Sequence, residues 1–189
     1  MANSITIHQD EREWEGYGDF RSSQTDFSNF SNWMNNITME FRNVVDRYDA
    51  AMSDDGRIDI AEKSHIVKEL DEFMNCLTAL RFHLVEPNER FSVENKKFGF
   101  AYSIEKDGEG WKGEGRFTKK YKIRMEKFSS WYEKVMLKQF QTLSETYKKV
   151  TADEFIDNQE REQLFAIVDV FFFEILLVRN FIHRREWTE

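Results

Sequence analysis

The pattern Trp-x-Gly-x-Gly-x-Phe occurs twice in this chain, over residues 14–20 and 111–117. Alternate residues of a strand share one face, so each pattern would align its aromatic rings with its glycines. Glycine in a strand permits the close approach of another group. Rings from a neighbouring strand or helix could cover the glycines without any ligand, and we expect this arrangement. The alternative is a ligand groove, whose walls would be Trp14, Phe20, Trp111 and Phe117.

Charged side chains beside the two patterns form a second set of candidate binding residues. Acids precede and enter the first pattern: Asp10, Glu11, Glu13 and Glu15. Bases interleaved with aromatic residues follow the second, among them Lys119, Lys120 and Lys122. Such a mixture can bind single-stranded nucleic acid, but a solvated loop, or pairing with the acids, explains the same residues and is favoured. Opposite charges at the two ends would steer a partner protein or self-association.

Residue types used in catalysis or metal binding form no motif in the sequence. The histidines are His8, His65, His83 and His183, and none has a cysteine or acid at metal-ligand spacing. No Gly-x-Ser-x-Gly nucleophile motif occurs. Cys76 lies between apolar positions of an expected helix, which indicates a packed thiol rather than a reactive one. The sequence therefore favours a non-enzymatic protein without a cofactor or a metal.

A tandem duplication is predicted from internal similarity. The two aromatic patterns align at an offset of 97. At an offset of 98 the aligned pairs are Ile58/Ile156, Asp59/Asp157, Glu62/Glu160, Asp71/Asp169, Phe73/Phe171 and Arg81/Arg179. A one-residue slip within the first helix aligns Phe41 with Phe140 and Tyr48 with Tyr147. We predict a first unit over residues 1–90 and a second over residues 91–189, which share one core.

Each unit is predicted to be ββαα, a hairpin followed by two helices. Ile5 and Ile7 alternate along the first strand of one unit, and residues 98–104 play the same part in the other. A polar turn leads to the aromatic pattern, which forms the second strand. A lone hairpin is marginally stable, so both hairpins should lie against the helices, as one four-stranded antiparallel sheet or as two ribbons.

Apolar residues at three-four spacing predict the first helices over roughly 27–50 and 125–149. The second helices should begin near Asp59 and Asp157, where Asp-x-x-Glu is a capping-box arrangement. The predicted fold class is therefore α+β, dominated by helices, with pseudo-twofold symmetry and a small antiparallel sheet.

Two charges recur within the second helices, in apolar surroundings. Asp71 and Arg81 lie in the first unit, and Asp169 and Arg179 lie in the second. Ten residues separate the acid from the base, so the two cannot touch within one helix. We expect them to pair across the pseudo-twofold axis or to bond helix ends, as a structural network.

The last helix carries an extra apolar stripe. Its residues are Ile167, Val170, Phe173 and Leu177, in place of Glu69, Glu72, Asn75 and Ala79. A helix that is apolar almost all round is buried on more than one side. Either this is the central helix of the fold, which we favour, or the added residues form a homodimer surface.

The junction between the helices of the first unit, residues 51–62, resembles a degenerate EF-hand loop. Gly56 fits the sixth position, Ile58 the eighth and Glu62 the twelfth. Ala51 stands at the first position, where the resemblance requires a carboxylate ligand. A turn followed by a helix cap accounts for the same residues, and we expect no metal.

The charge balance differs between the two halves. Residues 1–97 carry 19 acids and 11 bases, whereas residues 98–189 carry 16 of each, so the net charge of −8 lies in the first half. Uniform nucleic-acid binding is therefore disfavoured. A single cysteine and a start without a basic, apolar leader favour a cytoplasmic protein. The apolar stretch 164–182 contains charged residues, which indicates a buried helix rather than a membrane span.

These features favour a non-enzymatic interaction protein, such as an adaptor, an inhibitor or an immunity-type protein. Its acidic first unit would bind a protein partner with a basic surface. The alternative is a binder of a small nucleotide-like ligand, or an enzyme, with its site between the two units.

Overall fold

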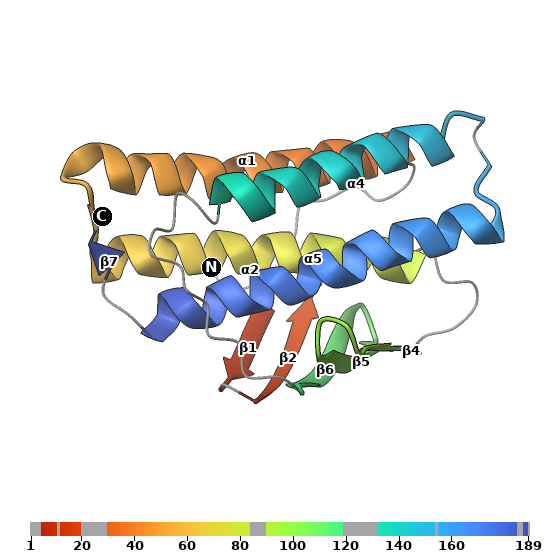
Figure 1. Cartoon of the computed structure of the whole chain (residues 1–189), viewed down its shortest axis with the longest axis horizontal. Coiled ribbons are helices and arrows are strands. Elements are labelled where there is room, and N and C mark those ends of the chain that lie inside the picture. The colour runs from red at the N-terminus through yellow and green to blue at the C-terminus, as the bar shows by residue number, and fades with distance from the viewer. Residues whose placement is uncertain are drawn as a thin grey trace.

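The computed structural model describes residues 5–10, 12–19, 30–83, 90–118, 132–153, 155–184 and 187–188, and it has an α+β fold. The described helices are α1 (Phe30–Asp54), α2 (Ile60–His83), the π-helical turn η1 (Tyr132–Met136), α4 (Leu137–Val150) and α5 (Asn158–Arg184). Figure 1 shows them in layers, with α1 and α4 on the outside and α2 and α5 between these helices and the sheet.

An antiparallel sheet of five strands lies on the other side of α2 and α5. Its order is β1 (Ile5–Gln9), β2 (Glu13–Asp19), β6 (Gly110–Phe117), β5 (Phe100–Asp107) and β4 (Arg90–Asn95). Pairing of β2 with β6 joins both hairpins into one sheet. Of the two predicted arrangements, a single sheet and two separate ribbons, the structure therefore has the single sheet. The predicted number of four strands was wrong, because β4 pairs with the outer edge of β5. A short pair, β3 (Arg57–Ile58) and β7 (Trp187–Thr188), joins the α1–α2 turn to the segment after α5.

Reciprocal side-chain caps begin both central helices. Asp59 Oδ1 accepts the N–H of Glu62 at 2.8 Å, while the N–H of Asp59 donates to the Glu62 carboxylate at 2.9 Å. Asp157 and Glu160 repeat the arrangement at 2.8 and 3.1 Å. Each cap satisfies two backbone donors that the first turn of a helix leaves open. The predicted starts of α2 and α5 are confirmed.

The π-helical turn η1 coincides with a slip in the repeat. The predicted helix over residues 125–149 was continuous, whereas the structure places η1 over residues 132–136 before α4. A π-helical turn absorbs one extra residue in a helix without changing the faces that flank it. Trp33 aligns with Trp131 at an offset of 98 and Phe41 with Phe140 at an offset of 99, so the slip falls in the interval that contains η1.

Residues that the repeat alignment equates touch each other in every layer. Phe41 of α1 stacks on Phe140 of α4, with ring centroids 4.0 Å apart and planes within 3°. Phe73 of α2 meets Phe171 of α5 edge to face at 5.2 Å. Gly16 lies opposite Gly113 in the sheet. In a two-fold arrangement, equivalent residues meet only at the axis.

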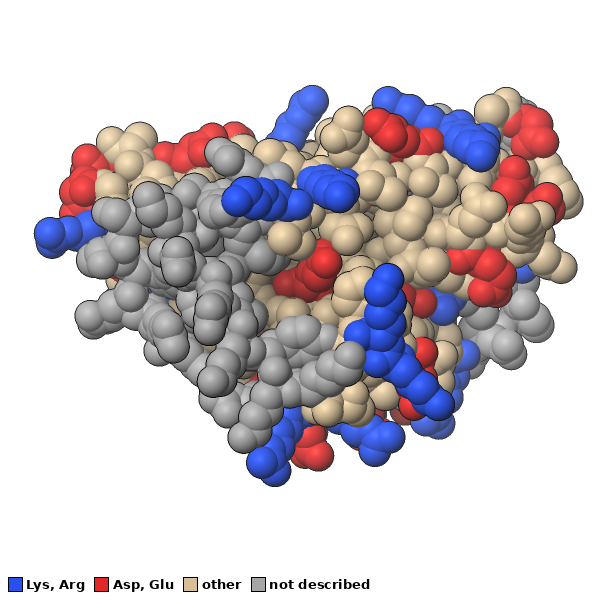
Figure 2. Space-filling view, in the orientation of Figure 1, with Lys and Arg blue, Asp and Glu red and all other residues tan. Residues whose placement is uncertain are grey.

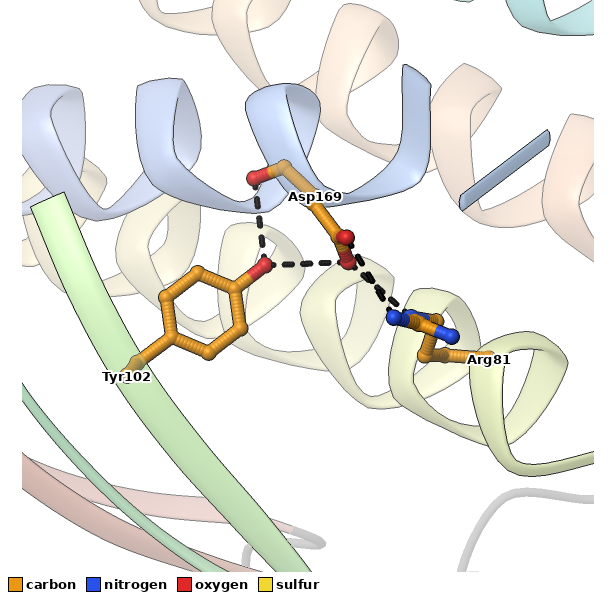
Figure 3. A network of polar contacts seen from close by, with 3 residues as sticks. All are labelled: Arg81, Tyr102 and Asp169. Carbon is orange, nitrogen blue, oxygen red and sulfur yellow. Dashed lines mark hydrogen bonds and ion pairs between the residues drawn. The ribbon is translucent and has the colours of Figure 1, made fainter. Parts of the chain in front are cut away.

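Two buried Arg–Asp pairs connect α2 with α5. Arg81 donates to Asp169 at 3.0 Å, and Arg179 donates reciprocally to Asp71. The Tyr102 hydroxyl on β5 lies 3.1 Å from Asp169 Oδ1, so one pair also contacts the sheet (Figure 3). All four charged residues are buried. Of the two expected arrangements, the structure shows the charges paired between the two central helices rather than bonded to helix ends.

Only one residue of the extra apolar stripe of α5, Phe173, is fully buried. Phe173 stacks on Phe100 of β5 with ring centroids 4.4 Å apart, and Ile167, Val170 and Leu177 are half-buried against the core. α5 lies between α4 and the sheet (Figure 1), and the burial of Phe173 removes that residue from a homodimer surface. Within the described residues, no helix combines the length and apolar character needed to cross a bilayer.

Breaking one buried pair should destabilise the fold strongly. Asp71→Asn leaves the Arg179 guanidinium buried without its charge partner, so we expect the free energy of unfolding to fall by about 3–5 kcal/mol. Asp71→Leu/Arg179→Met removes both charges and should cost less. Arg47→Ala breaks the exposed Arg47–Glu69 pair and should cost about 1 kcal/mol or less. Urea unfolding measures all three, and equal losses for Asp71→Asn and Arg47→Ala would contradict the structural role.

Candidate functional site

The two tryptophans of the repeated pattern cover glycines on the opposite strand. Trp14 lies opposite Gly115 and Trp111 lies opposite Gly18 in the β2–β6 pair. Both rings face the helices, and the two residues are 3% and 1% exposed. A methyl group added to Gly18 would lie 2.7 Å from Cε2 of Trp111. The expected aromatic cover is therefore confirmed, and it fills the space that a ligand groove on this face would need.

Phe117, another residue of the predicted groove, also packs against the helices. Phe117 is half-buried and its ring centroid lies 5.9 Å from that of Phe173. Trp111 donates its ring N–H to Asn75 Oδ1 at 2.8 Å, which anchors the ring to α2. Several predicted binding residues lie outside the described residues: Glu11, Phe20, Lys119, Lys120 and Lys122.

The outer face of the sheet, which points away from the helices, carries a polar row across all five strands. Strand registers place its members directly opposite one another, from β1 through β2, β6 and β5 to β4. In this order they are His8, Glu15, Glu114, Ser103 and Ser92. The row exists because side chains alternate between the two faces of a strand.

A hollow of about 940 Å³ lies over this face, and we call it the sheet hollow. Every strand of the sheet contributes to its lining, so the face is concave. Its charged lining residues, apart from His8, are Asp10, Glu13, Glu15, Glu94, Glu114 and Arg116. Five carboxylates therefore face one guanidinium. By contrast, acidic and basic side chains are interspersed over the helices visible in Figure 2.

The centre of the sheet hollow contains a pair of like charges. Glu15 of β2 lies directly opposite Glu114 of β6. Like charges at directly opposed positions destabilise a sheet. Within the described part of the chain, neither carboxylate makes a hydrogen bond or an ion pair. Both carboxylates can therefore interact with a ligand or partner.

The structure brings together three of the predicted acids. Asp10, Glu13 and Glu15 all line the sheet hollow. Asp10 also shapes the hairpin, because its Oδ1 accepts the N–H groups of Arg12 and Glu13 at 2.6 and 2.8 Å. Sequence reasoning missed Glu94 and Glu114. The alternation of Phe91 and Val93 with polar residues was the available signal for β4 and hence for Glu94.

The carboxylates of the EF-hand-like turn accept hydrogen bonds from backbone N–H groups of the same segment. Asp55 Oδ1 accepts the N–H of Arg57 at 2.9 Å, and Asp59 and Glu62 form the cap of α2. Gly56 adopts a φ of +71°, which favours glycine. A turn and a cap thus account for these residues. Among the described residues, no group of three or more His, Cys, Asp or Glu side chains is arranged to hold a metal ion.

Two other titratable groups are shielded from water. Burial raises the pKa of the Cys76 thiol well above its usual value, which suits a packed residue. Burial also raises the pKa of Glu174 to about 7, although the Gln139 amide, which donates at 3.4 Å, opposes the shift. The Oε2 atom of Glu174 has no hydrogen-bond partner among the described residues. Neither group belongs to the sheet hollow.

No protein-family model matches the chain, and neither a curated protein nor a solved structure matches it.

A methyl group at Gly18 should disturb the contact between β2 and Trp111. Overpacking of this kind costs about 1–3 kcal/mol, so Gly18→Ala should lower the free energy of unfolding by that amount. Gly16→Ala is the matched control, because its methyl group would meet its nearest neighbours at 3.0–3.1 Å. Thermal or urea unfolding should rank Gly18→Ala as the more costly variant. The opposite ranking would contradict the proposed cover.

Glu174 should make stability depend on pH. Its pKa is about 7 in the folded chain against an ordinary value of 4.5, so the folded chain binds more protons than the unfolded chain between these values. The contribution of Glu174 to stability therefore falls as pH rises through this window, and the loss is complete above pH 7. Glu174→Gln imitates the protonated form.

Urea unfolding at pH 5 and pH 8 tests this dependence. The advantage in stability of Glu174→Gln over the unmodified chain should be larger at pH 8. Glu145→Gln, at an exposed position of α4, should show the same difference from the unmodified chain at both pH values. A difference for Glu174→Gln that does not change with pH would contradict the shifted pKa.

Proposed function

We propose that this protein is a non-enzymatic binding protein whose sheet hollow receives a protein partner through a basic surface. The observation that carries the proposal is the lining of the hollow, in which five carboxylates face one guanidinium. Charge complementarity of this kind accelerates encounter and selects against wrong partners. An adaptor, an inhibitor and an immunity-type protein all act through such a surface. A lone buried cysteine suits a reducing compartment, so we propose a cytoplasmic setting.

The binding surface is proposed to belong to both units rather than to the acidic first unit alone. Asp10, Glu13 and Glu15 come from the first unit, and Glu94 and Glu114 come from the second. The β2–β6 pairing brings the two sets together. The tandem duplication remains part of this proposal, and it is supported by the reciprocal Arg–Asp pairs and by the contacts between equivalent residues in each layer.

A small-ligand site between the units is the second candidate. The sheet hollow does span both units, which favours a site at that position. Its acidic lining would repel the phosphates of a nucleotide, so a small ligand here would carry positive charge. A homodimer through Ile167, Val170 and Leu177 would have to use residues that are already half-buried in the core.

Removing the central carboxylates should weaken the binding of a basic probe. Two exposed charge contacts at about 0.5 kcal/mol each correspond to about a fivefold change in Kd. We therefore expect Glu15→Gln/Glu114→Gln to bind a fluorescein-labelled nonamer of arginine about fivefold more weakly at low salt. Fluorescence anisotropy measures the Kd, and the difference should shrink at high salt.

Asp46→Asn/Asp49→Asn is the matched control for this test. It removes the same amount of charge from exposed positions of α1, on the far side of α2 and α5 from the sheet (Figure 1). The control should bind the probe as the unmodified chain does. Equal weakening in both variants would show that net charge, and not the sheet hollow, attracts the probe.

A further inference from the structure

Opposite charges face each other in the rows that flank the central polar row of the outer face. On one side of the central row, Glu13 of β2 lies opposite Arg116 of β6. On the other side, Glu105 of β5 lies between Lys112 of β6 and Arg90 of β4. Opposite charges at facing positions stabilise a sheet, whereas like charges destabilise it. The pair of carboxylates in the central row therefore departs from the pattern on both of its sides.

The bases that flank Glu114 along β6 face carboxylates of their own. Lys112 lies 3.2 Å from Asp107 Oδ2, and Asp107 lies beyond Lys112 on the side away from Glu114. Arg116, on the other side of Glu114, lies opposite Glu13. Neither base forms an ion pair with Glu114 in the described part of the chain. The central pair of carboxylates is therefore left for a cation from another molecule.

An exposed aromatic ring lies beside this pair. Tyr17 follows Glu15 by two residues along β2, so both side chains lie on the outer face. Tyr17 is 57% exposed, and among the large apolar side chains that are exposed in the described residues it is the one that belongs to the sheet. Tyrosine is enriched among the residues that contribute most to binding energy at protein interfaces.

A second hollow, of about 570 Å³, lies over the outer face next to the sheet hollow. Tyr17 lines this second hollow together with Lys112 and Arg90. The two hollows share members of the central row, namely His8, Glu15, Ser103 and Glu114. A side chain that extends from the sheet hollow into the second hollow would therefore cross the pair of carboxylates and reach the tyrosine ring.

The spacing of these three side chains suits a guanidinium. The Cβ atoms of facing residues in an antiparallel pair are about 4.5–5.5 Å apart, so one planar group with several N–H donors can bond to both carboxylates. Tyr17 is about 7 Å from Glu15 along the strand, which is within reach of a long side chain. A guanidinium can stack on an aromatic ring while its N–H groups bond to carboxylates, whereas an ammonium is compact and strongly hydrated.

We infer that Glu15, Glu114 and Tyr17 form a site for one arginine side chain of the partner, whose guanidinium bonds to both carboxylates and stacks on the tyrosine ring. The inference rests on the proposed function, because it names the group that the basic partner places at the centre of its contact. The other carboxylates of the sheet hollow lie apart from any exposed ring, so they attract lysine and arginine alike.

Two fluorescein-labelled peptides of equal charge test this site on the full chain, a nonamer of arginine and a nonamer of lysine. We expect the arginine nonamer to bind about two- to fivefold more tightly at low salt, which is the effect of one exposed cation–π contact. Tyr17→Leu should remove this preference by weakening the arginine nonamer. Tyr17→Phe keeps the ring and should preserve the preference. Fluorescence anisotropy gives the Kd of each nonamer.

A charge-matched variant separates the site from the rest of the sheet hollow. Glu15→Gln/Glu114→Gln should weaken both nonamers and remove the preference for arginine. Glu13→Gln/Glu94→Gln removes the same amount of charge from the same hollow, at positions that do not face each other. This control should weaken both nonamers by the same factor and keep the preference. Loss of the preference in the control as well would overturn the site.

The remaining outcomes separate the arginine site from the proposed function. If both nonamers bind equally tightly, and Glu15→Gln/Glu114→Gln weakens both, the proposed function stands and the arginine site is overturned. A preference for arginine that persists in Tyr17→Leu also overturns the site. If neither nonamer binds the unmodified chain, the site and the proposed function are both overturned.

Discussion

Two buried guanidinium groups determine how the halves of this protein fit together. Arg81 and Arg179 lie in an apolar interior, where an unpaired charge is very costly. Each finds its carboxylate on the other central helix, at Asp169 and Asp71. Sliding α2 along α5 would break both pairs at once. The two helices therefore have one register. The hydrogen bond between Tyr102 of β5 and Asp169 of α5 fixes the sheet relative to the helices.

Each face of the sheet carries a feature that lowers the stability of the sheet. On the inner face, Gly18 and Gly115 weaken their strands so that Trp111 and Trp14 can lie close to the backbone. On the outer face, like charges oppose each other at the centre of the sheet hollow. The inner arrangement is compensated by burial of two large rings, whereas nothing in the described structure compensates the outer one. Uncompensated departures from local stability are expected at functional sites.

Sequence reasoning was successful where the determinants were local or repeated. The caps at Asp59 and Asp157 depend on residues three positions apart, and the pairing of Arg81 with Asp169 followed from a spacing that no single helix can bridge. The hollow could not be predicted in this way, because Glu15 meets Glu114 only through the long-range pairing of β2 with β6. β4 was missed because the first strand of the second unit was expected over residues 98–104, and no strand was expected before it.

Corresponding positions in the two halves of the chain differ, and these differences give the two hairpins unlike surroundings. Asn75 holds the ring of Trp111 in one half, whereas its counterpart Phe173 packs on Phe100 in the other. β4 pairs with the edge of one hairpin, whereas no described strand pairs with the outer side of β1 in the other. The two hairpins keep the same register, with Ile5 opposite Gly18 in one and Tyr102 opposite Gly115 in the other, so these local exchanges change the surroundings of each hairpin without changing its register.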